Sequence, residues 1–166
     1  MGAAGLREYA FTSFDLDMTL RQAEEALRAF FRPFPRLEAW RSTHADLCRR
    51  RGYIEIGAGR VVRSEWEPFG LSFQQTCNLP IQGACADVML RALRLVHRRL
   101  RQARLRGGLV ASVHDELLLE VHADDAEIAR DLLEDAMIGA FIETFPGAPV
   151  NGVAAAKVGR TWAEVK

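Results

Sequence analysis

The pattern of apolar and polar positions is helical over most of the chain and strand-like between Gly107 and Val121. The clearest helix is expected from Gln82 to Leu100, with apolar side chains on one face and arginines on the other. The arginine stripe is typical of a solvated helix face, and a track for phosphates is the alternative. The apolar face comprises Met89, Ala92, Leu93, Val96 and Leu100, and the stripe comprises Arg91, Arg94, Arg98 and Arg101.

Cap and turn signals divide the residues before Gln82 into shorter elements. Thr19 and Gln22 have the spacing of a capping box, which marks the start of a helix. Pro80 is expected to break a helix, because proline lacks the N–H that a helix interior uses. The expected elements are helices over residues 20–31, 36–50 and 69–78 and a hairpin with a glycine turn over residues 53–63.

Two short apolar runs, residues 109–113 and 117–119, surround a polar His-Asp-Glu sequence at residues 114–116. They predict an antiparallel hairpin with a tight turn. Asp115 and Glu116 at the tip of a buried hairpin would be costly unless they bound something, and hard carboxylate oxygens suit Mg²⁺. An ordinary exposed hairpin turn is the alternative for these residues alone.

The residues after the hairpin predict one more helix and one more strand. Asp124 and Glu127 have capping-box spacing and mark the start of a helix that ends near Phe141. Residues 150–158 are expected to form the last strand. The predicted fold is α+β: a small antiparallel sheet, made of the His-Asp-Glu hairpin and the C-terminal strand, packed with several helices.

Length and composition indicate a globular domain and exclude several classes of protein. The 166 residues, with 49% hydrophobic and 27% charged side chains, suffice for one domain with a core. No apolar run approaches the ~20 residues of a membrane span, and the first residues lack a secretory signal pattern. Three cysteines without a C-x-x-C pair favour reduced thiols in a cytoplasmic protein over a disulfide frame or structural zinc.

Charge is distributed unevenly along a chain whose formal net charge is zero. Residues 1–107 carry 18 basic and 11 acidic side chains, a net charge of +7, and residues 108–166 carry 4 and 11, a net charge of −7. Of the 22 cations, 20 are arginine, which suits planar, bidentate phosphate contacts. A GC-rich genome would explain the arginine-to-lysine ratio but not the segregation. The basic part is therefore suited to a polyanion.

Several segments in order resemble family A DNA polymerases, the DNA polymerase I type. Residues 78–87, Asn-Leu-Pro-Ile-Gln-Gly-Ala-Cys-Ala-Asp, resemble the family's N-x-P-x-Q-G-x-x-A-D sequence, and residues 113–117, Val-His-Asp-Glu-Leu, resemble its motif C. Flanking features of the family match at residues 30–35, 51–53 and 158–162. The resemblance covers essentially the whole chain.

The resemblance implies a role for five residues. Asp115 would be the metal-binding carboxylate of motif C in the palm, and Glu116 its acidic neighbour. His114 would approach the primer terminus. Gln82 and Asn78 would contact the minor groove of the primer–template duplex, where acceptors common to all base pairs allow an amide to test pairing geometry rather than base identity. The implied cofactor is Mg²⁺, in a two-metal site only partly supplied by this chain.

Other features of the family are not found in this sequence. Motif A, which supplies an aspartate from an upstream strand, and motif B, the nucleotide-binding helix, are missing, as are the thumb and exonuclease-like regions. Gln74 stands where family members often carry an arginine. Residues 1–166 are therefore expected to be a single C-terminal palm and partial fingers segment, incomplete for catalysis alone. The complete enzyme would act on primer–template DNA and dNTPs, with a second chain as one source of motifs A and B.

Two other classes of function stay open at the level of sequence. One is a truncated, non-catalytic remnant that serves as a DNA-binding or interaction module. The other is a His-Asp metal phosphohydrolase built around His114 and Asp115, although the remaining histidines lack a suitable pattern. Asn78 and Gln82 also have a structural alternative, which is to cap a helix that Pro80 starts.

Overall fold

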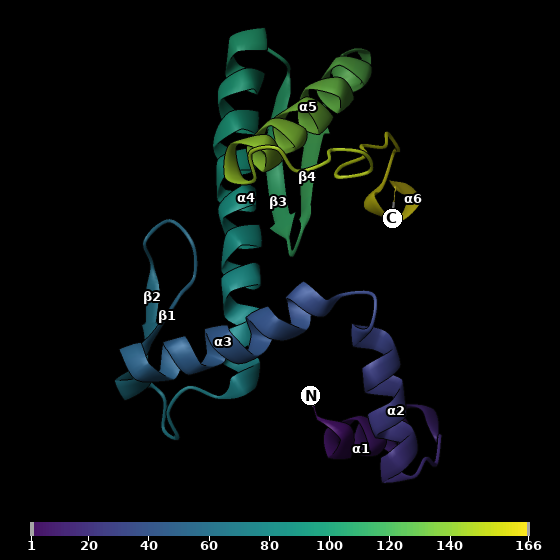
Figure 1. Ribbon diagram of the computed structural model, residues 1–166. Helices are drawn as coiled ribbons and strands as arrows, with labels where there is room; N and C mark the ends of the chain where they lie inside the picture. Colours follow the sequence, from purple (N-terminus) through teal and green to yellow (C-terminus); the bar gives the residue numbers. More distant parts are fainter. Residues whose placement is uncertain (1, 166) are drawn as a thin grey trace. The chain divides into compact units, whose positions relative to one another are not determined.

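The computed structural model describes residues 2–165, which form helices and two small antiparallel sheets (Figure 1). The α+β fold expected from the sequence is confirmed. The chain divides into two compact units, Met1–Pro80 and Ile81–Lys166, and the division falls inside helix α4 (Phe73–Ala103). No helix among the described residues is long and apolar enough to cross a membrane. The assignment of all 166 residues to one palm and partial fingers segment stays a prediction.

The first unit contains three helices and a short hairpin. The expected capping box is confirmed, because Thr19 Oγ1 accepts from the Gln22 N–H and Gln22 Oε1 accepts from the Thr19 N–H. Gly52 ends the third helix with a φ of 75°, a conformation that favours glycine. The first helix has no side-chain cap and gave no sequence signal. The elements are α1 (Ala3–Phe14), α2 (Leu20–Phe31), α3 (Pro35–Arg51), β1 (Tyr53–Glu55), β2 (Val61–Arg63) and η1 (Ser64–Trp66).

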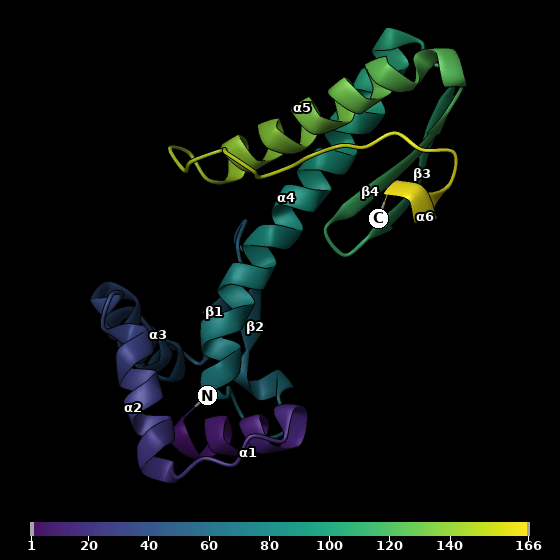
Figure 2. The same ribbon diagram turned by 90° about the vertical axis from the view of Figure 1, so that its right-hand side faces the viewer.

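The second unit is built around the long helix α4. Its core joins α4, the hairpin of β3 (Gly107–Val113) and β4 (Glu116–Val121), and α5 (Ala126–Thr144), as Figure 2 shows. Leu117 of β4 is buried in the same cluster as Val96 of α4 and Ala136 of α5. The expected apolar face of α4 is confirmed: Ala92, Val96 and Leu100 are buried, and Met89 and Leu93 pack against them. Two short elements complete the unit, η2 (Ala123–Asp125) and α6 (Trp162–Val165).

The prediction that Pro80 breaks a helix is wrong. The two helices expected over residues 69–78 and 82–100 are one continuous helix with Pro80 inside it. Its start lies at Ser72 and Gln75, which form a capping box through bonds of 2.8 and 3.1 Å. Proline removes one hydrogen bond from the helix, but the capping box stabilises the turns before it, and the buried apolar face from Val88 onward stabilises the turns after it.

Two predictions after the hairpin are also wrong. No strand forms over residues 150–158: Val153 N–H closes a turn on Val150 O at 3.3 Å, and Ala156 N–H donates to Glu134 at 3.0 Å. These partners take the place of a β-ladder. Asp124 does not cap α5, which begins at Ala126 without a side-chain cap. The Asp124 carboxylate binds an arginine instead, as described below.

Candidate nucleic-acid and metal site

The His-Asp-Glu sequence lies at the tip of the β3–β4 hairpin, as expected. Val113 pairs with Glu116, so His114 and Asp115 form a two-residue turn. His114 has a φ of 55°, in the left-handed region. Two-residue hairpin turns commonly need a positive φ, and histidine is among the residue types that adopt it more readily. The turn therefore fixes the position of Asp115 relative to the two strands.

The hairpin is held by its apolar face and by a close backbone contact at its base. Leu109 and Leu119 pack against the buried cluster that contains Leu117. Gly107 has a φ of 137°, and a Cβ at this position would lie 2.1 Å from the Glu120 carbonyl oxygen. Only glycine allows the two strands to approach this closely. Packing and close approach together hold the base and the apolar face of the hairpin against the second unit's core.

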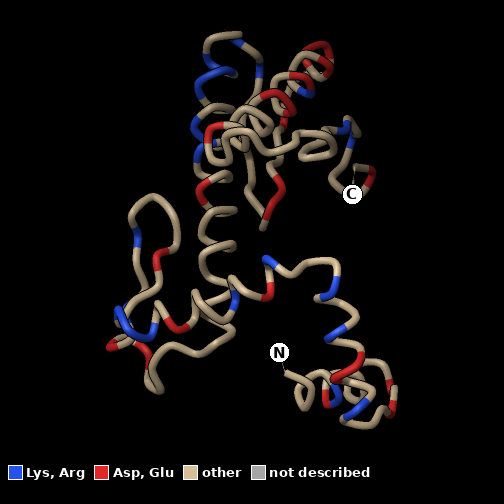
Figure 3. Tube along the Cα trace, in the orientation of Figure 1, with Lys and Arg blue, Asp and Glu red and all other residues tan. Residues whose placement is uncertain are grey.

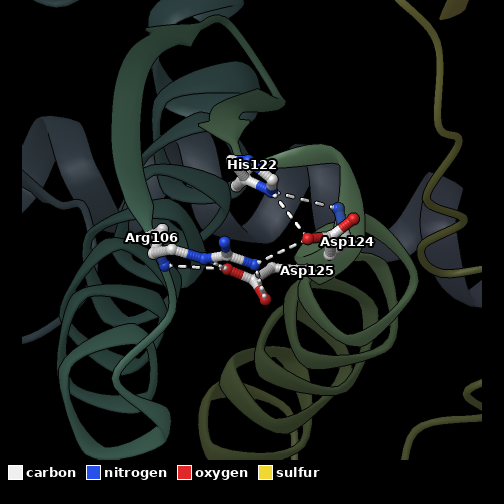
Figure 4. Close-up of polar contacts among 4 residues, drawn as sticks. All are labelled: Arg106, His122, Asp124 and Asp125. Atoms are coloured by element: carbon white, nitrogen blue, oxygen red, sulfur yellow. Dashed lines mark hydrogen bonds and ion pairs between the residues drawn. The ribbon is translucent and has the colours of Figure 1, made fainter.

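A charged cluster joins the base of the hairpin to the start of α5 (Figure 4). Arg106 precedes β3 and donates to Asp125 from its backbone N–H at 3.0 Å, from Nε at 2.9 Å and from Nη2 at 3.1 Å. Arg106 Nη2 also donates to Asp124 at 3.2 Å, while His122 Nδ1 accepts from the Asp124 N–H at 3.3 Å. The hydrogen bonds from Arg106 lower the pKa of Asp125 to about 2.

This cluster, Arg106 with His122, Asp124 and Asp125, was missed at the level of sequence. The backbone N–H of His122 also donates to the Arg106 carbonyl at 2.7 Å, next to the Gly107–Val121 pair that begins the β-ladder. The signal that could have found it is an arginine immediately before the hairpin and an Asp-Asp pair immediately after it. The residues just before the first strand and just after the second strand of a hairpin lie close together wherever the two strands pair in register.

The expectation that the acidic tip is buried is wrong. His114, Asp115 and Glu116 are all exposed, so a metal ion is not needed to offset a burial cost. Asp115 and Glu116 line a cavity of about 340 Å³ together with Met137 of α5 and residues 153–157. The carboxylates are therefore accessible to an ion or a ligand.

The residues at the tip fit Mg²⁺ by chemistry but not by number. Two neighbouring carboxylates offer the hard oxygen ligands that Mg²⁺ prefers, with water filling the remaining positions. Among residues 2–165, no three His, Cys, Asp or Glu side chains are placed to hold a metal ion. Glu134 also lines the cavity, but it accepts from the Ala156 N–H at 3.0 Å. A two-metal site would need a further carboxylate.

Asn78 and Gln82 are exposed residues within α4, one in each unit. Because α4 starts at Phe73, the alternative that they cap a helix is wrong. Within the described part of the chain, neither side-chain amide makes a hydrogen bond. Both amides are therefore available for a ligand. Asp87, at the end of the same motif, is buried and has an interaction within the protein.

The chain matches the family model described as DNA polymerase family A over residues 5–164. The chain belongs to DNA polymerase family A. All five residues to which the sequence assigned a role lie within this matched range of the family A model. The family membership expected from the motifs is confirmed.

Relatives and a solved structure agree with membership of family A. The thermostable DNA polymerase I of Thermus filiformis is 34% identical over 163 residues, which is 93% of this chain and 18% of the relative. DNA polymerase I of Chloroflexus aurantiacus is 32% identical over 148 residues, 86% of this chain and 15% of the relative. The chain thus spans about a fifth or less of the length of these relatives.

The structural similarity is to the polymerase domain of M. smegmatis Pol1, in a complex with DNA primer-template and dNTP. The TM-score is 0.71 and the identity 25%, over 84% of this chain and 24% of that chain. Neither the phosphohydrolase nor a separate interaction module gains support from these similarities.

Proposed function

We propose that this chain forms the C-terminal palm and partial fingers segment of a DNA-directed DNA polymerase that acts in DNA replication or repair. The observation that carries the proposal is the family A match over residues 5–164, which includes an accessible Asp115–Glu116 pair at the tip of the β3–β4 hairpin. The activity is template-directed nucleotidyl transfer, and the substrates of the complete enzyme are primer–template DNA and dNTPs. A cytoplasmic location accords with the three free cysteines.

In this proposal, Asp115 is a metal ligand, and Glu116 is the acidic neighbour that supports it. Family A DNA polymerases generally depend on Mg²⁺, which neutralises charge that develops on the transferred phosphoryl group. The two-residue turn places Asp115 at the exposed tip of the hairpin, where its carboxylate is open to an ion. A further carboxylate comes from outside these 166 residues, from another segment of polypeptide or from a second chain.

The same proposal assigns DNA contacts to His114, Gln82 and Asn78. The exposed amides of Gln82 and Asn78 donate to minor-groove acceptors that every base pair offers, so they contact correctly paired DNA without reading its sequence. His114 lies beside Asp115 at the exposed turn and approaches the primer terminus. Gln82→Ala should weaken duplex binding by about 1–2 kcal/mol, to a similar extent for all base pairs.

The experiment compares the isolated chain with a chimera. Residues 5–164 replace the matching segment of the Thermus filiformis polymerase, and Mg²⁺-dependent primer extension is measured with all four dNTPs. The isolated chain should be inactive, because it supplies only part of the two-metal site, and the chimera should extend the primer. Extension by the isolated chain that is abolished by Asp115→Ala would show a complete site within these residues. A chimera that folds and binds primer–template DNA but never extends it would contradict the proposed function.

A further inference from the structure

Charge is divided sharply within the second unit. Residues 88–106 contain seven arginines and no acidic residue, whereas residues 108–166 contain 4 basic and 11 acidic side chains. Figure 3 shows basic positions along the C-terminal part of α4 and acidic positions on the hairpin and α5. Opposite charges on different parts of one molecule allow two copies of it to attract each other.

Three of the seven arginines have acidic partners inside the protein. Arg91 and Arg94 lie 3.8 and 3.5 Å from the Glu143 carboxylate. Arg106 binds the acidic pair at the start of α5, as described above. These contacts connect α4 and the hairpin to α5. The expectation of a purely solvated arginine stripe is therefore wrong for its first half.

Three of the remaining arginines form a surface that we call the α4 arginine patch: Arg98, Arg101 and Arg104. All three are exposed, and none has an ion-pair partner among residues 2–165. Arg98 and Arg101 share one face of α4, and the opposite face carries Ala92 and Val96, which are buried in the core with the hairpin and α5. These two arginines therefore point away from the hairpin.

Three side chains of the hairpin form a second surface, which we call the hairpin carboxylates: Asp115, Glu116 and Glu120. All three are exposed, and within the described part of the chain none of them makes a side-chain ion pair or hydrogen bond. Lys157 lines the same cavity as Asp115 and Glu116 but pairs with neither. Successive side chains of a strand point to opposite faces, and Leu117 packs on the α4 side. Glu116 and Glu120 therefore point away from α4.

The patch and the hairpin carboxylates face opposite sides of the second unit. Arg98 and Arg101 point outward from one side of the core, and Glu116 and Glu120 point outward from the other side. The two surfaces therefore cannot neutralise each other within one copy. A second copy of the chain offers each surface its complement, and surfaces on opposite sides of a molecule meet head to tail rather than about a two-fold axis.

We propose that the α4 arginine patch of one copy binds the hairpin carboxylates of a second copy. A guanidinium presents paired N–H donors that match the two oxygens of a carboxylate. Arg98 to Arg104 extends over about 9 Å and Glu116 to Glu120 over about 13 Å, so several pairs form at once. Each contact leaves one surface free at either end, so further copies add to the pair. The contact does not depend on a catalytic role of Asp115.

Two complementary variants of the 166-residue chain test the contact. The patch variant has glutamine at every arginine of the patch, and the carboxylate variant has the matching amide at every hairpin carboxylate. Each variant keeps one surface, so neither should self-associate, whereas their mixture should form a complex of one copy of each. These side chains are exposed and unpaired, so both variants should keep the unfolding midpoint of the unmodified chain. The substitutions are Arg98→Gln/Arg101→Gln/Arg104→Gln and Asp115→Asn/Glu116→Gln/Glu120→Gln.

The main experiment titrates the N-terminally labelled patch variant with the carboxylate variant and follows fluorescence anisotropy, in EDTA and about 0.05 M NaCl to limit screening. The mixture should bind at least about tenfold more tightly than either variant binds itself, because each self-complex lacks three charge pairs. In sedimentation, the mixture should stop at the mass of two copies, while the unmodified chain continues to larger assemblies. The control variant Arg28→Gln/Arg36→Gln/Arg50→Gln removes the same charge from exposed positions of α2 and α3 and should still self-associate.

Three results would overturn the proposal. Self-association of either variant that is as tight as the mixture would mean that other surfaces join the copies, such as the exposed aromatic side chains of α1 and α2. A complex that disappears after nuclease treatment would mean that nucleic acid bridges the copies. An unmodified chain that stays monomeric up to about 1 mM would remove the contact altogether. None of these measurements uses polymerase activity, so they do not depend on the proposed function.

Discussion

Substituting alanine for Gly107 should loosen the hairpin that carries the acidic turn. The φ of 137° at Gly107 lies in a region that is essentially restricted to glycine. Forcing alanine into this conformation costs roughly 1–3 kcal/mol of folding stability. The new Cβ would lie 2.1 Å from the Glu120 carbonyl oxygen and 2.5 Å from the Val121 Cα. Because both atoms belong to the backbone, the strands must separate, which removes about one further hydrogen bond worth ~1 kcal/mol. The expected loss is therefore about 2–4 kcal/mol.

Hydrogen exchange with mass spectrometry measures this loss locally. Amides of residues 107–121 should exchange about 30-fold to 1,000-fold faster in Gly107→Ala, while amides of the first unit are unchanged. Gly108→Ala is a matched control, because Gly108 has no positive φ and a Cβ there would meet nothing within 4 Å. Similar exchange rates in both variants would refute the claim that the close approach at Gly107 holds the hairpin.

Three further outcomes follow from the described contacts. The pKa of Asp125 is about 2, so the stability from its bonds to Arg106 is complete above the unfolded value of ~3.9 and is lost as pH falls toward 2. Asp125→Asn should flatten the dependence of Tm on pH in that window, and an unaltered curve would count against the ion pair. Pro80→Ala should stabilise α4 by roughly 1–3 kcal/mol in urea unfolding, because the Thr76 carbonyl regains its helical partner; a loss of stability would contradict this. Val96→Ala should cost roughly 2 kcal/mol in the same assay, since Val96 is fully buried, and no loss would argue against the assigned core.

Elements with local signals were predicted correctly from the sequence. The capping box at Thr19, the glycine end of α3 at Gly52 and the His114-Asp115 turn depend on residues within a few positions of one another. Their hydrogen bonds and backbone angles are set by the local sequence. The same holds for the apolar face of α4, whose period of three to four residues is independent of its partners.

Elements whose partners lie far away in sequence were not predictable in this way. Asp124 resembles a helix cap, but Arg106, 18 residues earlier, binds its carboxylate. Residues 150–158 resemble a strand, but Glu134, 22 residues before Ala156, takes a backbone N–H. Both differences arise because side chains brought close by the fold compete for the same groups.

In the candidate site, too, the local feature was predicted and the feature that depends on distant residues was not. The sequence placed Asp115 at the hairpin tip correctly, but it could not tell that the tip is exposed. Exposure depends on which elements cover the turn. Among the residues described, α5 and residues 153–157 border one side of it and leave a cavity of about 340 Å³. The role of Asp115 in catalysis stays a prediction.

The central claim is that Asp115 is the metal-binding carboxylate of a DNA polymerase. The most direct measurement is the Mg²⁺-dependent primer-extension rate of the polymerase chimera carrying Asp115→Ala, against the same chimera carrying Asp135→Ala. Asp135 is an exposed carboxylate on α5. Asp115→Ala should slow extension by roughly 10³-fold, about 4 kcal/mol of transition-state stabilisation, with primer–template binding retained and the Asp135→Ala rate unchanged. An Asp115→Ala chimera that extends the primer as fast as the Asp135→Ala chimera would contradict the claim.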